Sequence, residues 1–369
     1  MGAVTVTDAA DTEVFLTGFP GFLGSALLER LLARGDGPVA CLVQPRYLET
    51  ARRRAREITD GLAGVDDEDV RLLEGDITEP DLGLDDAAAL DDVGEVYHLA
   101  AVYDLGVDRD LAEAVNVGGT EHVLEFVEER GARLHYVSTC YVSGRYDGVF
   151  TEDHLREGQS FNNHYEETKY RAEVAVQERM ADGLPATIYR PAIVVGDSRT
   201  GETDKYDGPY YLLRLLLAQP SWLSVTFAPP GADGAELNVV PRDFVVDAIA
   251  SLSDREESVG EVYQLCDPAP LPVSRFVDVL ADAAGHRTVG VPTTKSLARA
   301  VTERLEAWLD VDLEPATLDY LDHPTRYACP ATRRALAGSG IEVPPFESYA
   351  DRLVDYVRRN PDVRDDAMV

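Results

Sequence analysis

TGFPGFLG, residues Thr17–Gly24, separates a short apolar run from a segment with helical spacing. The run before it, EVFL at 13–16, has the β-branched and aromatic character of a buried parallel strand. The segment after it, 25–35, carries leucines at helical spacing and ends at Gly35, which can cap a helix. In such a strand–turn–helix, glycine permits a tight turn and a close approach of the backbone to a pyrophosphate, which the helix N-terminus faces. The pattern TGxxGxxG therefore predicts a dinucleotide-binding unit.

Strand and helix patterns alternate as far as about residue 195, which predicts an α/β fold with a doubly wound parallel sheet of the Rossmann type. We expect residues 1–195 to form the dinucleotide-binding domain and residues 196–369 a smaller, mostly helical substrate-binding part, with segments near 239–265 (239–246 and 262–265) returning to the main sheet. The expected strands are 39–43, 70–74, 95–99, 134–137 and 186–190, and the expected helices are 50–62, 116–131, 165–182, 243–252, 274–285, 295–309 and 349–359.

A second motif, YEETK at 165–169, indicates catalysis in addition to binding. Tyr165 and Lys169 are four residues apart, so a helix places both side chains on one face. The ammonium then favours the phenolate and lowers the pKa of the phenol towards the range of an acid/base catalyst. Ser138 and Thr139 follow the expected strand 134–137, and a hydroxyl there can hydrogen-bond a carbonyl oxygen while the tyrosine protonates it.

At these residues the chain resembles the extended short-chain dehydrogenase/reductases. Matching segments follow in order: GDI at 75–77, HLAA at 98–101, NVGGT at 116–120 and YRP at 189–191. The resemblance implies that Thr139, Tyr165 and Lys169 form a catalytic triad that Asn116 supports. Thr139 is preferred because it lies five residues before Gly144, as in the family's S/T-x-x-x-x-G pattern, and Ser138 stays open. With the glycine turn, the implied cofactor-binding residues are Thr17, Gly18, Pro20, Gly21, Phe22, Leu23, Gly24, Asp76, Ile77, Ala100, Ala101, Tyr165, Lys169, Pro191 and Ile193.

Within that family the sequence is most similar to thioester reductases and the fatty acyl-CoA reductase (male-sterility) group, in segments 21–24, 75–84 and 161–173. This resemblance implies hydride transfer from NADPH to an acyl-CoA, a carrier-bound acyl thioester or another lipophilic carbonyl. A homodimer, formed through two long helices, is the family's default. A sugar-nucleotide epimerase or dehydratase, or a hydroxysteroid-type dehydrogenase, stays open because these enzymes share the triad. A non-catalytic NADP-sensing module is disfavoured because such proteins typically lose the tyrosine or the lysine.

The end of the second expected strand, LVQPR at 42–46, bears on the choice of cofactor. An NAD site usually places Asp or Glu about 20 residues beyond the glycines to bind the ribose 2′-hydroxyl. No carboxylate occurs at 44–46, and Arg46 can pair with a 2′-phosphate, so NADP(H) is favoured over NAD(H). Further along, KYDGPYYLL at 205–213 with Trp222 can line an apolar acyl site, although aromatics at this spacing also fit a core.

The composition predicts the setting. Among the 369 residues, 67 acidic against 34 basic side chains give a net charge of -33, and only Lys169, Lys205 and Lys295 are lysines. Acids spread over the whole chain favour a halophilic protein over an acidic docking surface. No basic patch suits nucleic acid, and the scattered four cysteines and seven histidines predict no metal site. The polar N-terminus lacks a signal-peptide layout and no apolar run can span a bilayer, which predicts a cytoplasmic protein without a membrane span.

Overall fold

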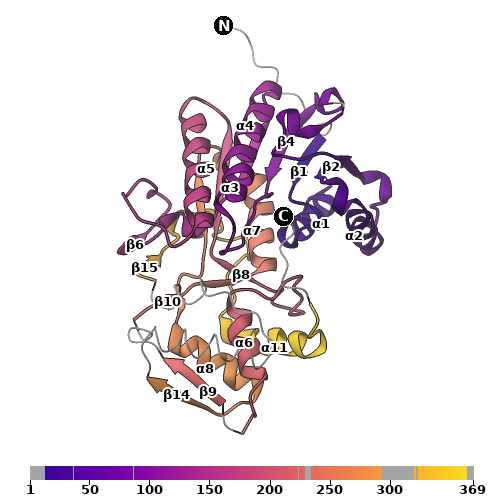
Figure 1. Cartoon of the computed structure of the whole chain (residues 1–369). Helices are drawn as coiled ribbons and strands as arrows, with labels where there is room; N and C mark the ends of the chain where they lie inside the picture. The colour runs from indigo at the N-terminus through magenta and orange to yellow at the C-terminus, as the bar shows by residue number, and fades with distance from the viewer. Residues whose placement is uncertain are drawn as a thin grey trace.

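The computed structural model describes residues 13–35, 37–85, 87–222, 224–228, 234–292, 320 and 323–363. Its centre is a sheet built from β1 (Glu13–Thr17), β2 (Val39–Val43), β3 (Val70–Glu74), β4 (Val93–His98), β5 (Arg133–Val137), β7 (Ala186–Pro191) and β12 (Val262–Leu265). Their order is β12-β7-β5-β4-β1-β2-β3, and every neighbouring pair is parallel (Figure 1). The chain reverses its direction of travel across the sheet beside β1, where doubly wound folds bind ligands at the carboxyl ends of the strands. The predicted fold class is confirmed.

Helices cover both faces of this sheet. The buried residues of β1 divide accordingly: Val14 and Leu16 pack into one core cluster and Phe15 into another. Because both faces are covered, the strands are apolar runs rather than alternating polar and apolar ones. On the side of Val14 lie α1 (Phe22–Arg34), α2 (Leu48–Gly61) and α7 (Arg242–Ser253), and on the side of Phe15 lie α4 (Gly119–Arg130) and α5 (His164–Ala181), with α3 (Arg109–Ala112) and a π-helical turn at 113–118 leading into α4.

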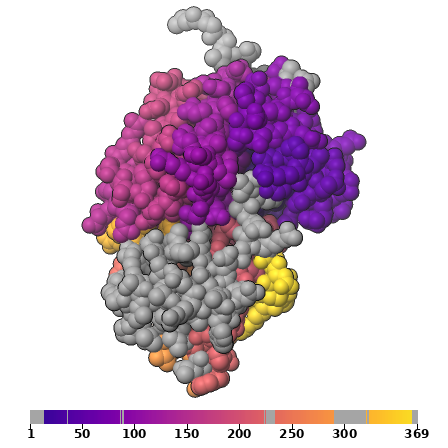
Figure 2. Space-filling model, viewed as in Figure 1, coloured from indigo at the N-terminus to yellow at the C-terminus, as the bar shows by residue number. Residues whose placement is uncertain are grey.

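Most of the remaining described residues form a second body beyond the carboxyl ends of the strands (Figures 1 and 2). It has its own core, in which Tyr206, Leu213, Phe276, Phe346 and Val354 are buried together. Its described helices are α6 (Pro209–Leu217), α8 (Val273–Ala284) and α11 (Ala350–Arg359). Its short strands pair two by two: β8 (Ile193–Val195) with β11 (Val239–Pro241), β9 (Ser224–Ala228) with β14 (Thr288–Pro292), and β10 (Glu236–Leu237) with β13 (Leu271–Pro272). A further pair, β6 (Gly148–Phe150) and β15 (Thr325–Tyr327), and the short helix α10 (Pro330–Ala335) lie beside the main sheet.

The path of the chain between the two bodies differs from the sequence expectation in one place. Residues 262–265 form the edge strand β12 of the main sheet, but 239–246 do not join that sheet. Instead β11 pairs with β8 in a separate two-stranded sheet. The chain then enters α7 directly after Pro241, because apolar residues recur at helical spacing and are buried against α1. The helix expected at 295–309 lies outside the described residues. Among the helices that are described, each is too short or too polar to span a bilayer.

Candidate active site

The glycine turn forms a cradle at the start of α1, and its geometry explains the residue types. Gly18 has φ +92°, and a Cβ there would lie 2.9 Å from the Ala100 backbone nitrogen. A Cβ on Gly24 would lie 2.3 Å from the Gly18 carbonyl oxygen, so helix α1 can pack on the turn only with glycine at this position. No side chain caps α1 and no acidic residue lies in its first turn. The N–H groups of the helix N-terminus and its positive dipole end therefore stay available to a phosphate.

A cavity of about 370 Å³ lies at this turn and extends to the second body of the protein. The sequence-predicted residues that line it are Thr17, Gly18, Pro20, Gly21, Phe22, Leu23, Gly24, Asp76, Ile77, Ala100, Ala101, Thr139, Tyr165, Lys169, Pro191 and Ile193. Ser138 also lines it, whereas Arg46 and Asn116 do not. The fold therefore brings the predicted triad and the predicted cofactor residues other than Arg46 onto one surface.

Asn116 acts behind the wall as a brace. Its amide is buried, accepts a hydrogen bond from the Val102 backbone nitrogen (2.9 Å) and donates to the Val102 carbonyl oxygen (3.0 Å). The same amide nitrogen donates to Thr168 Oγ1 (3.0 Å), one residue before Lys169 on α5. Asn116 thus fixes the loop after β4 against α5.

Arg46 lies at the exposed edge of the wall. Its guanidinium donates from Nε (3.0 Å) and Nη2 (2.8 Å) to Gln44 Oε1. Gln44 lines the cavity and donates through Nε2 to Asp76 Oδ2 (2.8 Å). The Gln44 side chain therefore lies between Arg46 and the predicted adenine end of the cavity.

The two candidate hydroxyls have different partners. Ser138 donates to Glu173 Oε2 at 2.5 Å, and Glu173 also accepts from Arg190 Nη2 at 2.6 Å. Glu173 and Arg190 are both fully buried, so the Ser138 hydroxyl belongs to a buried ion pair. The Thr139 hydroxyl accepts from the Tyr141 backbone nitrogen (3.2 Å) and donates to the Pro191 carbonyl oxygen (3.4 Å). It lies close enough to the Tyr165 phenol to lower the pKa of that group. Of the two hydroxyls, Thr139 is therefore the one beside Tyr165.

Burial dominates the protonation of Tyr165 and Lys169. It raises the pKa of Tyr165 to about 12, against the opposite effect of the Thr139 hydroxyl. It lowers the pKa of Lys169 to about 7, against the opposite effect of Glu173 one turn further along α5. The prediction that Lys169 lowers the pKa of the phenol is wrong here. Lys169 Nζ points to strand β5, where it donates to Tyr136 Oη (3.0 Å) and the Val137 carbonyl oxygen (2.9 Å).

A chain of hydrogen bonds fixes the strand ends under the cavity. Thr17 Oγ1 accepts from the Leu99 and Ala100 backbone nitrogens (3.2 Å each) and lies 2.8 Å from His98 Nδ1. His98 Nε2 lies 3.2 Å from Thr120 Oγ1, which donates to the Asn116 carbonyl oxygen. Burial lowers the pKa of His98 to about 3, so its ring is neutral and donates from Nε2. The network ties β1, β4 and the start of α4 together.

The segment expected to line an acyl site does so in part. Lys205, Asp207 and Leu212 line the cavity, whereas Tyr210 belongs to the core of the second body. Trp222 is 73% exposed and takes no part in the wall.

The wall also contains residues that the sequence analysis missed. Gln44 and Tyr47 flank Arg46 in the chain, and Tyr103 follows HLAA by two residues, so their positions beside known motifs were a usable signal. Tyr141 and Tyr320 also line the cavity, but Tyr320 arrives there only through the tertiary fold, and its local sequence gives no such signal. Within the described part of the chain, no group of three or more His, Cys, Asp or Glu side chains is arranged to hold a metal ion.

Comparisons with known proteins agree with a reductase of this fold. A family model described as male sterility protein matches residues 16–249. Glycine betaine reductase ATRR of Emericella nidulans is 29% identical over 311 residues, which is 78% of this chain and 23% of that protein. A linear gramicidin synthase of Brevibacillus parabrevis is 30% identical over 95% of this chain and 7% of its own length. The chain thus spans a quarter or less of the first curated relatives that it matches.

A solved structure shows the same fold over nearly the whole chain. The terminal R domain from the myxalamid PKS-NRPS biosynthetic pathway superposes with a TM-score of 0.81 at 28% identity, covering 96% of this chain and 92% of that one. With the glycine cradle and the Rossmann sheet, these similarities identify an NAD(P)-dependent oxidoreductase of the extended short-chain dehydrogenase/reductase type. The chain belongs to the male sterility protein family of NAD(P)-binding reductases.

Proposed function

We propose that this chain reduces an acyl thioester to an aldehyde with NADPH, through Thr139, Tyr165 and Lys169. The observation that carries the proposal is that these three side chains line the same cavity as the glycine cradle of Gly18, Gly21 and Gly24. The resemblance to thioester reductases and the superposition on a terminal R domain support a thioester as the substrate.

The cavity suits a nicotinamide dinucleotide. Gly18 and Gly24 leave the space that a Cβ would fill, and the uncapped start of α1 faces the position of a pyrophosphate. Gln44 and Arg46 offer an amide and a guanidinium at the adenine end, where an NAD site usually has a carboxylate. We expect Arg46 to pair with a 2′-phosphate, which favours NADPH over NADH. When bound, this cofactor supplies a hydride.

The chain's own residues supply the proton and hold the reacting oxygen. With its pKa raised to about 12, Tyr165 keeps its proton at neutral pH and can give it to the carbonyl oxygen as negative charge develops there. Thr139 donates a hydrogen bond to the same oxygen, and Lys169 supplies positive charge from the next turn of α5 when protonated. For a thioester, the carbonyl carbon gains a hydride and the oxygen gains the proton. The hemithioacetal then breaks its C–S bond, which releases an aldehyde and a thiol.

The proposal is tested by following NADPH and NADH oxidation in molar KCl with acyl-CoAs of graded chain length, beside simple ketones and aldehydes. Acyl-CoA-dependent loss of NADPH with an aldehyde as product is the expected result. Turnover of simple carbonyls alone would be consistent with the triad and would contradict a thioester as the substrate. No turnover in a protein that binds the cofactor would favour a sugar-nucleotide enzyme instead.

We also propose the setting in which the reductase works. Its acyl thioester comes from CoA or from a carrier protein, and a family-type homodimer forms in a salt-rich cytoplasm. The support for a salt-rich setting is the composition, with 67 acidic residues against 34 basic ones and three lysines in the whole chain. The homodimer and the source of the thioester follow from the family resemblance.

A further inference from the structure

The loop between β8 and α6, residues 196–208, supplies part of the cavity wall. Its residues in that wall are Thr203, Lys205, Asp207 and Gly208. None of these four is among the cofactor residues predicted from the sequence, most of which lie on the main sheet and the turns after its strands. The loop leads into α6, whose buried residues belong to the core of the second body. Its position therefore sets the shape of the cavity where the second body faces it.

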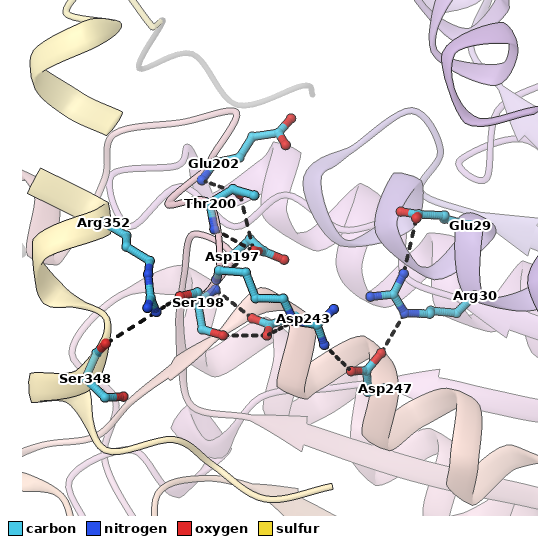
Figure 3. A network of polar contacts seen from close by, with 11 residues as sticks. Glu29, Arg30, Asp197, Ser198, Thr200, Glu202, Asp243, Asp247, Ser348 and Arg352 are labelled. Atoms are coloured by element: carbon cyan, nitrogen blue, oxygen red, sulfur yellow. Dashed lines mark hydrogen bonds and ion pairs between the residues drawn. The ribbon is translucent and has the colours of Figure 1, made fainter. Parts of the chain in front are cut away.

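A buried carboxylate fastens the start of this loop. Asp243 lies in the first turn of α7 and is 7% exposed. Its Oδ1 accepts from the Ser198 backbone nitrogen at 2.8 Å, and its Oδ2 accepts from the Ser198 hydroxyl at 2.6 Å (Figure 3). A buried carboxylate that loses its donors is costly, so both contacts oppose the release of the loop from α7.

The turn around Ser198 is constrained in itself. Asp197 Oδ1 accepts from the Thr200 backbone nitrogen at 2.9 Å (Figure 3). Gly201 has φ +76°, and a Cβ there would lie 2.2 Å from the Arg352 carbonyl oxygen of α11. The Arg352 guanidinium donates to the Ser198 carbonyl oxygen at 2.7 Å (Figure 3). Because the turn keeps this shape, the contact of Ser198 with α7 also places the residues that follow it.

The same end of α7 is fixed against the cofactor turn. The Arg242 guanidinium carbon lies 5.0 Å from the centre of the Phe22 ring, and Phe22 lines the cavity at the start of α1. One turn further along α7, Asp247 accepts from Arg30 Nε of α1 at 2.6 Å (Figure 3). Helix α7 is thus held on the helix that begins the cofactor site, and Asp243 holds the loop on α7.

Other contacts of the loop with the main body are more exposed. Asp204 accepts from Arg54 of α2 at 2.9 Å, and about a quarter of each of these side chains is exposed. Glu202 Oε2 lies 3.7 Å from Arg242 Nη2, and the Glu202 side chain is 42% exposed. Exposed ion pairs contribute little to stability, whereas hydrogen bonds to a buried charge contribute more. The contact between Asp243 and Ser198 is therefore the strongest of these ties.

We propose that Asp243 is a positioning residue for the substrate, because through Ser198 it holds residues 203–208 in the place that substrate binding requires. Asp243 itself lies outside the cavity wall and acts only through the loop. If the loop were released, only the fraction of molecules with the wall in place would bind substrate, and KM would rise by the inverse of that fraction. Saturating substrate would select that arrangement and preserve kcat. This inference rests on the proposed function only in that the cavity takes a carbonyl substrate beside the cofactor.

Two variants of Asp243 and a control on the same helix test the kinetic consequence. With the carbonyl substrate that the unaltered chain reduces best, we expect Asp243→Ala to raise KM about tenfold or more, to keep kcat within about twofold and to leave the Kd for NADPH unchanged. Asp243→Asn should recover most of the KM, because its amide accepts from the Ser198 backbone nitrogen and donates to the hydroxyl oxygen. Asp247→Asn, one turn along α7, is the control and should keep the KM.

Trypsin gives a second readout that needs no substrate. Arg199 follows Ser198 directly, and its side chain is 69% exposed. Cleavage within a folded protein requires local opening, so the rate of the cut after Arg199, identified by the mass of the fragments, measures how often this turn opens. We expect Asp243→Ala to be cut there about tenfold faster or more, and Asp243→Asn to be cut at nearly the rate of the unaltered chain.

The outcomes separate the inference from the proposed function. An unchanged KM in folded Asp243→Ala would overturn the inference and leave carbonyl reduction standing. A higher KM without faster cleavage after Arg199, a loss of kcat at unchanged KM, or an equal loss of affinity for NADPH would also contradict it. If Asp243→Ala does not fold, Ser198→Ala removes only the hydroxyl contact and should raise both KM and the cleavage rate, by about twofold to tenfold. Reduction of no carbonyl by unaltered protein that binds NADPH would overturn both.

Discussion

The Ser138 hydroxyl donates a hydrogen bond to Glu173 at 2.5 Å, and this contact distinguishes Ser138 from the neighbouring Thr139. Glu173 is fully buried with Arg190, and a buried carboxylate needs each of its donors. Ser138 is therefore tied to the ion pair beneath the cavity. Thr139, one residue later, meets the Tyr165 phenol instead.

Removing the Thr139 hydroxyl and removing the Ser138 hydroxyl should have different effects on kcat. Thr139→Val removes the hydrogen bond to the reacting oxygen at nearly constant volume, and we expect kcat to fall on the order of 10²–10³. Stability should fall by about 1 kcal/mol, because the Tyr141 backbone nitrogen loses its acceptor. Ser138→Ala leaves the buried carboxylate one donor short, and we expect about 1–3 kcal/mol less stability with a smaller loss of kcat. Urea unfolding and steady-state rates on both variants measure the contrast. A larger loss of kcat in Ser138→Ala would reverse the assignment.

Tyr165→Phe should lose the proton donor and keep the cavity. Because the phenol is the group that protonates the carbonyl oxygen, we expect a loss on the order of 10²–10⁴ in kcat. The Kd for NADPH, measured by fluorescence, should be unchanged. Tyr170→Phe, on the same helix but outside the cavity wall, is the matched control. Near-full turnover by Tyr165→Phe would remove this residue from the mechanism.

The buried Lys169 should make stability depend on pH. Its pKa falls from 10.5 to about 7 on folding, so between these values the unfolded chain binds more protons than the native one. Stability therefore rises with pH from about 7 upwards, by at most about 1.4 kcal/mol per pH unit from this group. Urea unfolding of the protein without cofactor at pH 7, 8 and 9, beside Lys169→Met, isolates the effect. The difference in unfolding free energy should grow in favour of the lysine protein as pH rises, and parallel profiles would show an unperturbed lysine.

Local motifs were the part of the site that the sequence could predict. The turn Thr17–Gly24 and the helical pair of Tyr165 and Lys169 depend on residues that are close in the chain, and the structure has both where the spacing indicated. The strand ends at 98–101 and 189–191 follow because parallel strands bring their carboxyl ends to one edge.

Contacts between distant segments could not be predicted in this way. The direction of the Lys169 ammonium depends on Tyr136 and the Val137 carbonyl oxygen of β5, and desolvation then sets its pKa. Tyr320 is about 150 residues beyond the Tyr165 motif in the chain, yet it lines the cavity and donates to Glu166 at 2.7 Å. The pairing of β11 with β8 depends on where the second body packs, which no local pattern encodes.

Arg46 should control the preference between the two nicotinamide cofactors. Its guanidinium is held by Gln44 at the edge of the wall, where a 2′-phosphate would supply a second partner. We expect Arg46→Ala to raise the Kd for NADPH about tenfold or more and to leave the Kd for NADH nearly unchanged. Arg52→Ala, an exposed arginine that pairs with Glu49 on α2, is the control. An equal loss of affinity for both cofactors would show that Arg46 acts through its positive charge in general and not through contact with the 2′-phosphate.

Salt should stabilise this protein, because its surface is crowded with like charge. The net charge is -33, and Asp66, Asp67 and Glu68 are one example of adjacent exposed acids. At low salt their repulsion favours the expanded chain, and molar KCl shortens the screening length to about 3 Å and removes most of that repulsion. We expect the midpoint of thermal unfolding to rise from low to molar KCl, by about 1 °C for each kcal/mol gained in a chain of this length. Sucrose at matched osmolality, which stabilises without screening, is the control. If KCl has no larger effect than sucrose, the acids serve another purpose, and a surface for a basic partner becomes the better interpretation.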